Sequence, residues 1–144
     1  MNITYGDKIT FEDFNALRTA VGWTALSERQ FNLTLHNAVF LCVAYDGGST
    51  IGMTRAVGDG GYNLLVTDVV VHPDYHHMGI GSEMVSRLLA FVKRTTLEGE
   101  TTMLNLMSAK GKEPFYEKFG FIARPTDTHG AGMFMYCKAG TTTE

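Results

Sequence analysis

The fold of this 144-residue chain is decided by the stretch Val69-Val70-Val71-His72-Pro73-Asp74-Tyr75-His76-His77-Met78-Gly79-Ile80-Gly81-Ser82. It begins in an apolar, β-rich run and ends where apolar residues start to recur at helical spacing. A glycine loop between a strand and a helix N-terminus presents backbone N–H groups to an anion, and the positive end of the helix dipole adds to the attraction. The stretch therefore predicts a phosphate or pyrophosphate site, although most Gly-x-Gly loops are only tight turns.

Other classes of site fit this loop poorly. It has no Gly-Lys-Ser/Thr of a Walker-type loop, and no Gly-x-Gly-x-x-Gly follows the first strand as in a dinucleotide fold. His72, His76 and His77 lie close in sequence, but adjacent histidines rarely converge on one ion. We expect no metal site.

The segments next to the loop predict a parallel strand pair. Residues 62–71 are nearly continuously apolar, which predicts an interior strand that is buried on both faces. Helical spacing continues to about Arg94, and residues 103–107 form the next strand. A right-handed crossover places that strand parallel to the first. We expect the two strands to separate and leave a cleft between them.

The rest of the chain supplies further elements of the same domain. Capping residues followed by apolar periodicity predict two helices, and apolar runs on either side of Asp46-Gly47-Gly48 predict a hairpin. A short helix begins at Glu113-Pro114, and Phe121-Ile122 is expected to pair with Gly132–Lys138. We predict one domain over residues 1–139 and a flexible tail over residues 140–144.

Composition limits the partners of the chain. It is 44% apolar and 19% charged with a formal net charge of −3, so it has no large basic field for nucleic acid. No apolar run approaches the roughly 18 residues of a membrane span, and the N-terminus does not resemble a secretory signal. We expect a cytoplasmic location and no membrane partner. Cys42 and Cys137 are both expected to be buried thiols.

Two motifs together indicate a family. The strand, proline loop and glycine turn over residues 69–82 resemble the acetyl-CoA motif of the GCN5-related N-acetyltransferases (GNAT family), and Glu113-Pro114-Phe115-Tyr116-Glu117-Lys118-Phe119-Gly120-Phe121 is similar to that family's Phe-Tyr-x-x-x-Gly-Phe segment. The resemblance implies an α/β (α+β) fold. Its central mixed, mostly antiparallel twisted sheet would have six to seven strands, about four helices and a splayed parallel strand pair.

The resemblance also implies acetyl-CoA as the donor and coenzyme A as the product. One departure is His76, which stands where the family usually has Arg or Gln. Most pyrophosphate contacts in the family come from backbone amides, so the loop is expected to keep its function. The implied cofactor-binding residues are Val69, Val70, Val71, His76, His77, Met78, Gly79, Ile80, Gly81, Ser82, Asn105, Phe115, Tyr116 and Lys118.

Two residues are candidates for proton chemistry. Tyr116 matches the family's usual proton donor to the coenzyme A sulfur, and a phenol suits that task. Asp68 lies within the apolar strand, where an unpaired carboxylate costs several kcal/mol. It is therefore a candidate base or amine ligand, and the alternative of a structural carboxylate stays open.

The acceptor is less well defined by the sequence. Gly130-Ala131-Gly132-Met133-Phe134-Met135-Tyr136 resembles the closing strand of the plant-type serotonin and arylalkylamine branch, which implies an aromatic or other small amine as the acceptor. We expect direct attack of a primary amine in a ternary complex, and a homodimer is a further expectation. The alternatives are a non-catalytic acyl-CoA-binding or regulatory module and acetylation of a protein or peptide amine.

Overall fold

A computed structural model describes residues 1–143 of the chain, with the side chains through residue 140. The chain divides into two compact units, Met1–Leu106 and Met107–Glu144, and each is described by itself. The predicted single domain over residues 1–139 and the flexible tail over residues 140–144 stay predictions, and Glu144 lies outside the described residues. No helix within residues 1–143 is both long and apolar enough to cross a membrane.

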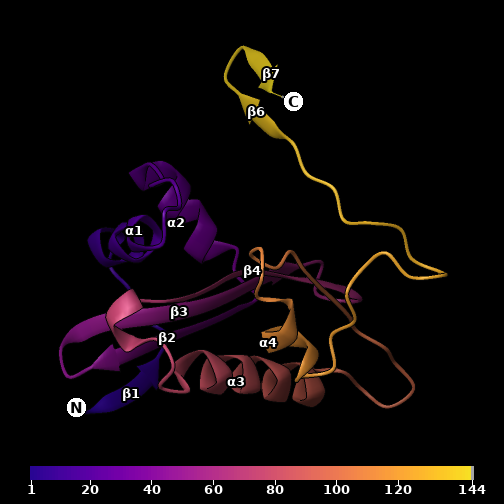
Figure 1. Ribbon diagram of the computed structural model, residues 1–144, viewed down its shortest axis with the longest axis horizontal. Helices are drawn as coiled ribbons and strands as arrows, with labels where there is room; N and C mark the ends of the chain where they lie inside the picture. The colour runs from indigo at the N-terminus through magenta and orange to yellow at the C-terminus, as the bar shows by residue number, and fades with distance from the viewer. Residues whose placement is uncertain (144) are drawn as a thin grey trace. The chain divides into compact units, whose positions relative to one another are not determined.

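The first unit is built on a mixed five-stranded sheet in the order β1-β2-β3-β4-β5 (Figure 1). Neighbouring strands are antiparallel except β4 and β5, which are parallel, as predicted. The predicted hairpin is confirmed as β2 and β3. The strands are β1 (Ile3–Gly6), β2 (Phe40–Asp46), β3 (Ser49–Gly58), β4 (Asn63–Val71) and β5 (Met103–Leu106).

The predicted count of six to seven strands in one sheet is wrong, because the last two strands form a sheet of their own. In the second unit, β6 (Tyr136–Lys138) pairs only with β7 (Thr141–Thr143), and Phe121-Ile122 is not a strand. Gly140 has a φ of +77°, so the chain reverses directly after β6 and supplies its partner from the adjacent residues. The thiol of Cys137 in β6 is exposed, whereas Cys42 is buried as expected.

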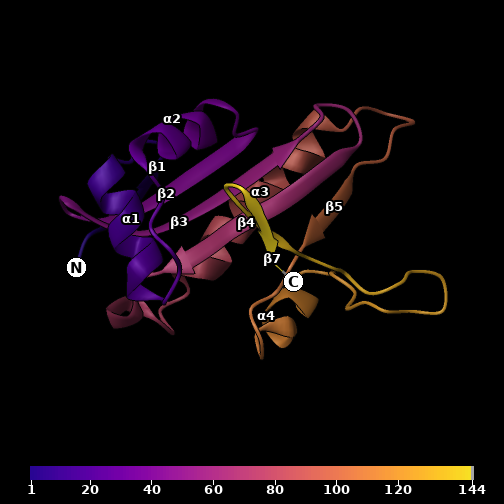
Figure 2. The ribbon, with the colours of Figure 1, turned by 90° about the horizontal axis from the view of Figure 1, so that it is seen from above.

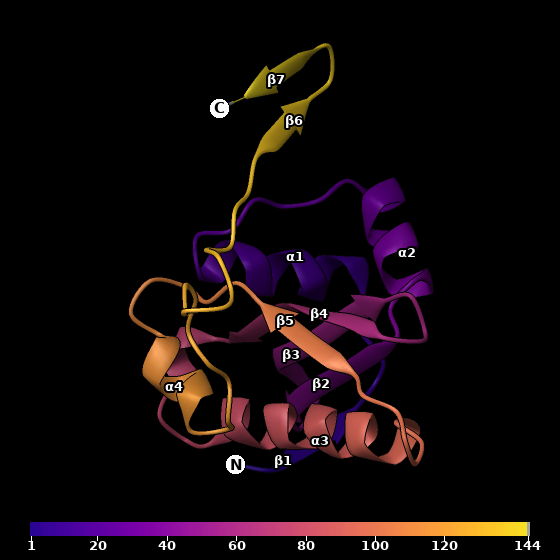
Figure 3. The same ribbon diagram turned by 90° about the vertical axis from the view of Figure 1, so that its right-hand side faces the viewer.

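Helices cover both faces of the five-stranded sheet (Figure 3). Two helices, α1 (Phe11–Ala20) and α2 (Glu28–His36), cover one face, and α3 (Ile80–Thr95) covers the other. The side chain of Thr10 caps α1, and Ser27 with Gln30 forms a capping box at α2. The fourth helix, α4 (Glu113–Glu117), belongs to the second unit. The expected number of about four helices is confirmed.

Strand β4 contains a bulge, and after it the side chains alternate between the two faces of the sheet in the opposite phase. Arg55 of β3 pairs with Asp68, whereas the next residue of β3 pairs with Val66, so Thr67 is an extra residue. Before the bulge, Leu64 and Val66 pack in the apolar cluster under α3. After it, Val70 packs with Phe14 of α1 on the opposite face. Buried side chains therefore lie on both faces of the strand, as expected, although they alternate with more exposed positions.

The segment between β4 and α3 is anchored to the rest of the first unit. It contains a single 3-10 turn, Pro73–Tyr75, and the Tyr75 hydroxyl donates to Oδ2 of Asp46 at 2.8 Å. The backbone N–H of Asn2 donates to Oδ1 of the same carboxylate at 2.9 Å. The hydrogen bonds from Asn2 and Tyr75 lower the pKa of Asp46 below its ordinary value of 3.8.

We predict that Gly58→Ala destabilises the protein by about 1–3 kcal/mol, because the new methyl group meets backbone that cannot move freely. A Cβ at Gly58 would lie 2.2 Å from the carbonyl oxygen of Asn63, far inside van der Waals contact. Gly48→Ala is the matched control, since a Cβ there meets nothing within 4 Å. Urea denaturation of both variants measures the difference, and equal free energies of unfolding would contradict the prediction.

We also predict that Tyr75→Phe raises the pKa of Asp46 towards its ordinary value without reaching it, because the Asn2 hydrogen bond remains. The lowered pKa stabilises the fold at pH values above 3.8, and this contribution is lost as the pH falls through the lowered pKa. Carboxyl NMR titration measures the change. Asp59, whose pKa is lowered by the backbone N–H groups of Gly61 and Tyr62, is the internal control. An unmoved Asp46 would show that Tyr75 does not contribute.

Candidate functional site

The N-terminus of α3 has the geometry of an anion cradle. Gly79 is the N-cap in the left-handed conformation, with a φ of +79°, and no side chain caps the helix. The first α3 hydrogen bond runs from the N–H of Glu83 to the carbonyl of Gly79, so the N–H groups of Ile80, Gly81 and Ser82 have no partner within the helix. The Ile80 side chain is buried in the core, so this residue can offer a ligand only its backbone.

The loop before the cradle is exposed and sharply turned. His77 has a φ of +62°, and His76, His77, Met78 and Gly79 are all exposed. A Cβ built on Gly79 meets no atom within 4 Å, so the space above the turn is open. The cradle can therefore be approached from outside by a group as large as a phosphate.

One acidic residue lies in the first turn of α3, but its charge is paired. Oε1 of Glu83 is 2.9 Å from Nε of Arg87, one turn further along the helix. The same guanidinium lies over the ring of Tyr5, 4.5 Å from its centroid. The pairing reduces the repulsion that Glu83 would exert on an anion at the helix N-terminus.

The ring of His76 is directed towards the end of β4. Its Nε2–H donates to the carbonyl oxygen of Val71 at a distance of 2.7 Å. This hydrogen bond ties the exposed loop to the strand, although the four residues between them contain no α-helix. His76 thus has a positioning role that the sequence did not indicate.

The bulge in β4 also determines where its backbone groups point. Side-chain face and hydrogen-bonding edge alternate together along a strand. Val69 and Val71 pack on the α3 face, as Leu64 and Val66 do before the bulge. All four residues therefore direct their backbone N–H and C=O groups to the edge of β4 that faces β5. Val70 packs on the other face, and its backbone faces β3. Of the three valines predicted to bind the cofactor, Val69 and Val71 have the required orientation.

Strand β4 continues beyond the end of its pairing with β5 (Figure 2), and the cleft expected between the two strands stays a prediction. The paired register runs from Asn63 with Met103 to Val66 with Leu106, and β5 ends there. Thr67–Val71 therefore has no β5 partner within the described first unit. An extended ligand with amide groups can pair with this edge as an added strand does, and its far end would reach the α3 N-terminus.

Asn105 is the predicted cofactor neighbour on β5. It pairs in register with Leu65, and its neighbours Leu104 and Leu106 pack in the cluster under α3. By alternation Asn105 lies on the α1 face of the sheet. No hydrogen bond of its side chain is recorded among residues 1–143.

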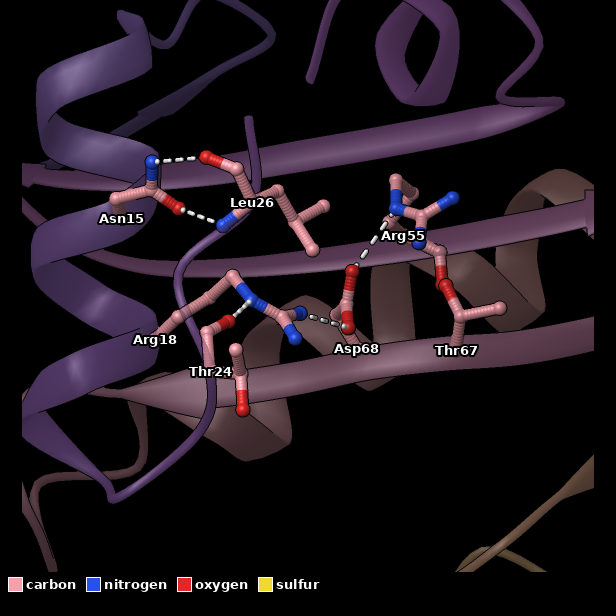
Figure 4. Close-up of polar contacts among 7 residues, drawn as sticks. All are labelled: Asn15, Arg18, Thr24, Leu26, Arg55, Thr67 and Asp68. Carbon is pink, nitrogen blue, oxygen red and sulfur yellow. Dashed lines mark hydrogen bonds and ion pairs between the residues drawn. The ribbon is translucent and has the colours of Figure 1, made fainter. Parts of the chain in front are cut away.

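Asp68 lies after the bulge on the α1 face and is bound by two arginines (Figure 4). Its Oδ2 is 2.9 Å from Nε of Arg55, and its Oδ1 is 3.5 Å from Nη1 of Arg18. Arg55 comes from β3 and Arg18 from α1, so neither is close to Asp68 in sequence. Neither arginine was predicted as a site residue from the sequence. The one available signal was an arginine inside an apolar strand.

Phe115, Tyr116 and Lys118 belong to the second unit, at α4 and its C-cap. The rings of Phe115 and Tyr116 are edge to face with their centroids 5.0 Å apart, and Tyr116 also contacts Phe121 at 6.0 Å. Burial raises the pKa of the Tyr116 phenol above its ordinary value of 10. The phenol therefore keeps its proton throughout the neutral pH range.

Comparison with known proteins agrees with this geometry. A family model described as an acetyltransferase (GNAT) domain matches residues 37–123, more than half of the chain. The uncharacterized N-acetyltransferase ycf52 of Pyropia yezoensis is 29% identical over 132 residues, which cover 89% of this chain and 72% of that protein.

Two solved structures have the same fold. A probable acetyltransferase of meticillin-resistant Staphylococcus aureus has a TM-score of 0.82 at 28% identity, over 94% of this chain and 99% of that chain. An acetyltransferase of the GNAT family from Streptococcus pneumoniae has a TM-score of 0.73 at 27% identity, over 95% and 97% of the two chains.

These three relatives carry no arylalkylamine or serotonin acetyltransferase name, so they do not support the branch suggested by the C-terminal motif. What they share with this chain is the fold and the acetyltransferase class. The family match includes the hairpin, β4, α3, β5 and α4, and thus every element that carries the cradle, the strand edge and Tyr116. This chain belongs to the GNAT family of N-acetyltransferases.

Proposed function

We propose that this protein transfers an acetyl group from acetyl-CoA to the primary amine of a small molecule, by direct attack in a ternary complex. The observation that carries the proposal is the continuity of two binding features. The unpaired edge of β4 at Val69–Val71, on the side of β5, leads towards the N-terminus of α3. Three N–H groups there have no partner in the helix. This arrangement suits a ligand with an extended amide arm that ends in a pyrophosphate.

The residues of the first unit would divide the donor between them. Backbone groups of Val69 and Val71 would pair with the pantetheine arm, and the N–H groups of Gly79 to Ser82 would bind the pyrophosphate. The open space above Gly79 fits this assignment. Because phosphate lies at the α3 end, the arm would run from Val71 back towards the bulge, and the thioester would lie near Val69.

Proton transfer would use Tyr116. A phenol that is protonated at neutral pH has a proton to give when the thiolate departs, and burial, which raises the pKa of the phenol, keeps it protonated. Asp68 suits the role of base less well, because both of its oxygens are engaged by guanidinium groups. We propose that Asp68 acts through Arg18 and Arg55, which it holds in place, and that the acceptor amine reaches the site as a free base.

The acceptor would enter from the α1 face, where Trp23 lies beside Arg18. An aromatic amine stays one candidate, and a protein or peptide amine is the alternative acceptor. A non-catalytic acyl-CoA-binding module is the alternative to catalysis. Release of thiol from acetyl-CoA in the presence of amines separates them, since a binding module would be stabilised by acetyl-CoA without turnover. A cytoplasmic location and a homodimer stay predictions.

We predict that Gly81→Val weakens acetyl-CoA binding by about tenfold or more with little loss of stability, because a branched side chain would obstruct phosphate at the amides. Ser86→Val is the matched control, since Ser86 is exposed on the same helix beyond the first turn. Thermal shift against acetyl-CoA concentration measures both. Unchanged affinity in a folded Gly81→Val variant would remove the cradle from the donor site.

We predict that Tyr116→Phe lowers kcat about 10- to 100-fold and leaves the KM for acetyl-CoA nearly unchanged. The raised pKa of the phenol keeps it protonated below pH 9.5, so the ratio of wild-type to variant kcat should be constant between about pH 6 and 9.5. Tyr62→Phe is the control, because Tyr62 is half exposed and its hydroxyl donates only to Sδ of Met103. Wild-type turnover by Tyr116→Phe would exclude it as the proton donor.

A further inference from the structure

The group of Arg18, Arg55 and Asp68 is not electrically balanced. The side chains are 17%, 12% and 5% exposed, so two guanidinium groups share one carboxylate largely away from water. One elementary positive charge is left over in the group. Uncompensated charge at this level of burial is costly, and a second anion would offset the cost.

The unused hydrogen-bond donors of the two arginines lie at defined atoms. Nε of Arg18 donates to the carbonyl of Thr24 at 2.7 Å, and its Nη1 faces Asp68 (Figure 4). Nε of Arg55 donates to Asp68. Among the hydrogen bonds and ion pairs of the described residues, Nη2 of Arg18 and both Nη atoms of Arg55 have no recorded partner.

These donors are not completely buried. Within the described residues, the one fully buried side-chain polar atom without a hydrogen bond is Oγ1 of Thr54, so the unpaired Nη atoms are not sealed in the core. The two Nη atoms of Arg55 form the end of the guanidinium fork, which matches the two oxygens of a carboxylate. Asp68 fixes the opposite side of that fork and restricts its rotation.

The position of the group relates it to the proposed reaction. Asp68 directly precedes Val69 and follows the bulge, beyond the last residue of β4 that pairs with β5. If the donor arm runs from Val71 towards the bulge, its thioester lies next to the residue that holds both arginines. An acceptor that approaches from the α1 face would pass the free ends of the two guanidinium groups.

We propose that the acceptor amine carries a carboxylate, which the Nη atoms of Arg55 and Arg18 bind. This inference rests on the proposed function and specifies the substrate class of the same site. The carboxylate supplies the missing negative charge and fixes one end of the acceptor, while the amine at the other end faces the thioester. The ring of Trp23, 5.5 Å from Cζ of Arg18, borders the same guanidinium and provides an apolar surface for the acceptor side chain.

The test compares amino acids with the amines formed by their decarboxylation: tryptophan with tryptamine, phenylalanine with phenethylamine, and lysine with cadaverine. Each pair differs only in the carboxylate. We expect at least one pair in which kcat/KM is about 10- to 100-fold higher for the carboxylate member, the range that a charge-assisted bidentate contact provides. The two members are compared at matched concentrations of the free amine, because their amine pKa values differ.

Two variants connect the preference to the arginines. Arg18→Gln leaves the Arg55–Asp68 pair in place, and Arg55→Lys keeps a cation beside Asp68 but removes the fork. Both should reduce the preference for the carboxylate member about tenfold and change kcat/KM for the decarboxylated amine much less. The control is Arg29→Gln, because Arg29 is exposed on α2 and has no recorded ion pair or hydrogen bond within residues 1–143.

Equal or better use of the decarboxylated member in every pair would overturn the proposal, and so would a preference that survives both arginine variants. If no amine is acetylated, the proposed function fails. The carboxylate site can then still be tested by the binding of acetylated compounds with and without a carboxylate. Thermal stabilisation by N-acetyltryptophan but not by N-acetyltryptamine, lost in Arg18→Gln, would support the carboxylate site. Equal effects of the two compounds would exclude it.

Discussion

The extra residue in β4 is the constraint on which the rest of the first unit depends. Thr67 has no counterpart in β3, so Val66 and Asp68 lie on opposite faces of the sheet despite being two positions apart. In an unbulged strand, Asp68 would face the apolar layer under α3, at a cost of several kcal/mol. The edge groups of Val69 and Val71 would then point to β3, and the edge proposed for the donor would not exist.

The ion pairs of Asp68 give the bulge a second consequence, because they connect three elements. Arg18 lies on α1, Arg55 on β3 and Asp68 on β4, so one carboxylate joins the helical layer to the sheet. Removing the carboxylate would leave two nearly buried cations facing each other, which is worse than losing either pair. Structural support and acceptor binding are therefore compatible at this carboxylate, because the same pairing that stabilises the layers also orients the unpaired Nη atoms.

Local patterns predicted the local structure well. The Ser27–Gln30 capping box, the hairpin around Gly47 and the amphipathic helix after Gly79 depend on residues a few positions apart, and the structure confirms all three. The bulge at Thr67 could not be predicted in this way, because it exists only in the register between β3 and β4. The apolar sequence of residues 62–71 gave no sign of it, since valine and leucine suit either face.

The same distinction explains why the proposed donor side could be predicted from the sequence and the proposed acceptor side could not. The edge, the anchored loop and the cradle all lie within residues 69–82, and His76 closes this stretch on itself through Val71. A contiguous stretch leaves a recognisable motif. The proposed acceptor side consists of Arg18, Arg55 and Asp68, which come together only through the packing of α1 on the sheet. The resemblance in residues 69–82 therefore indicates the reaction class, whereas the residues that we propose for the acceptor lie outside this motif.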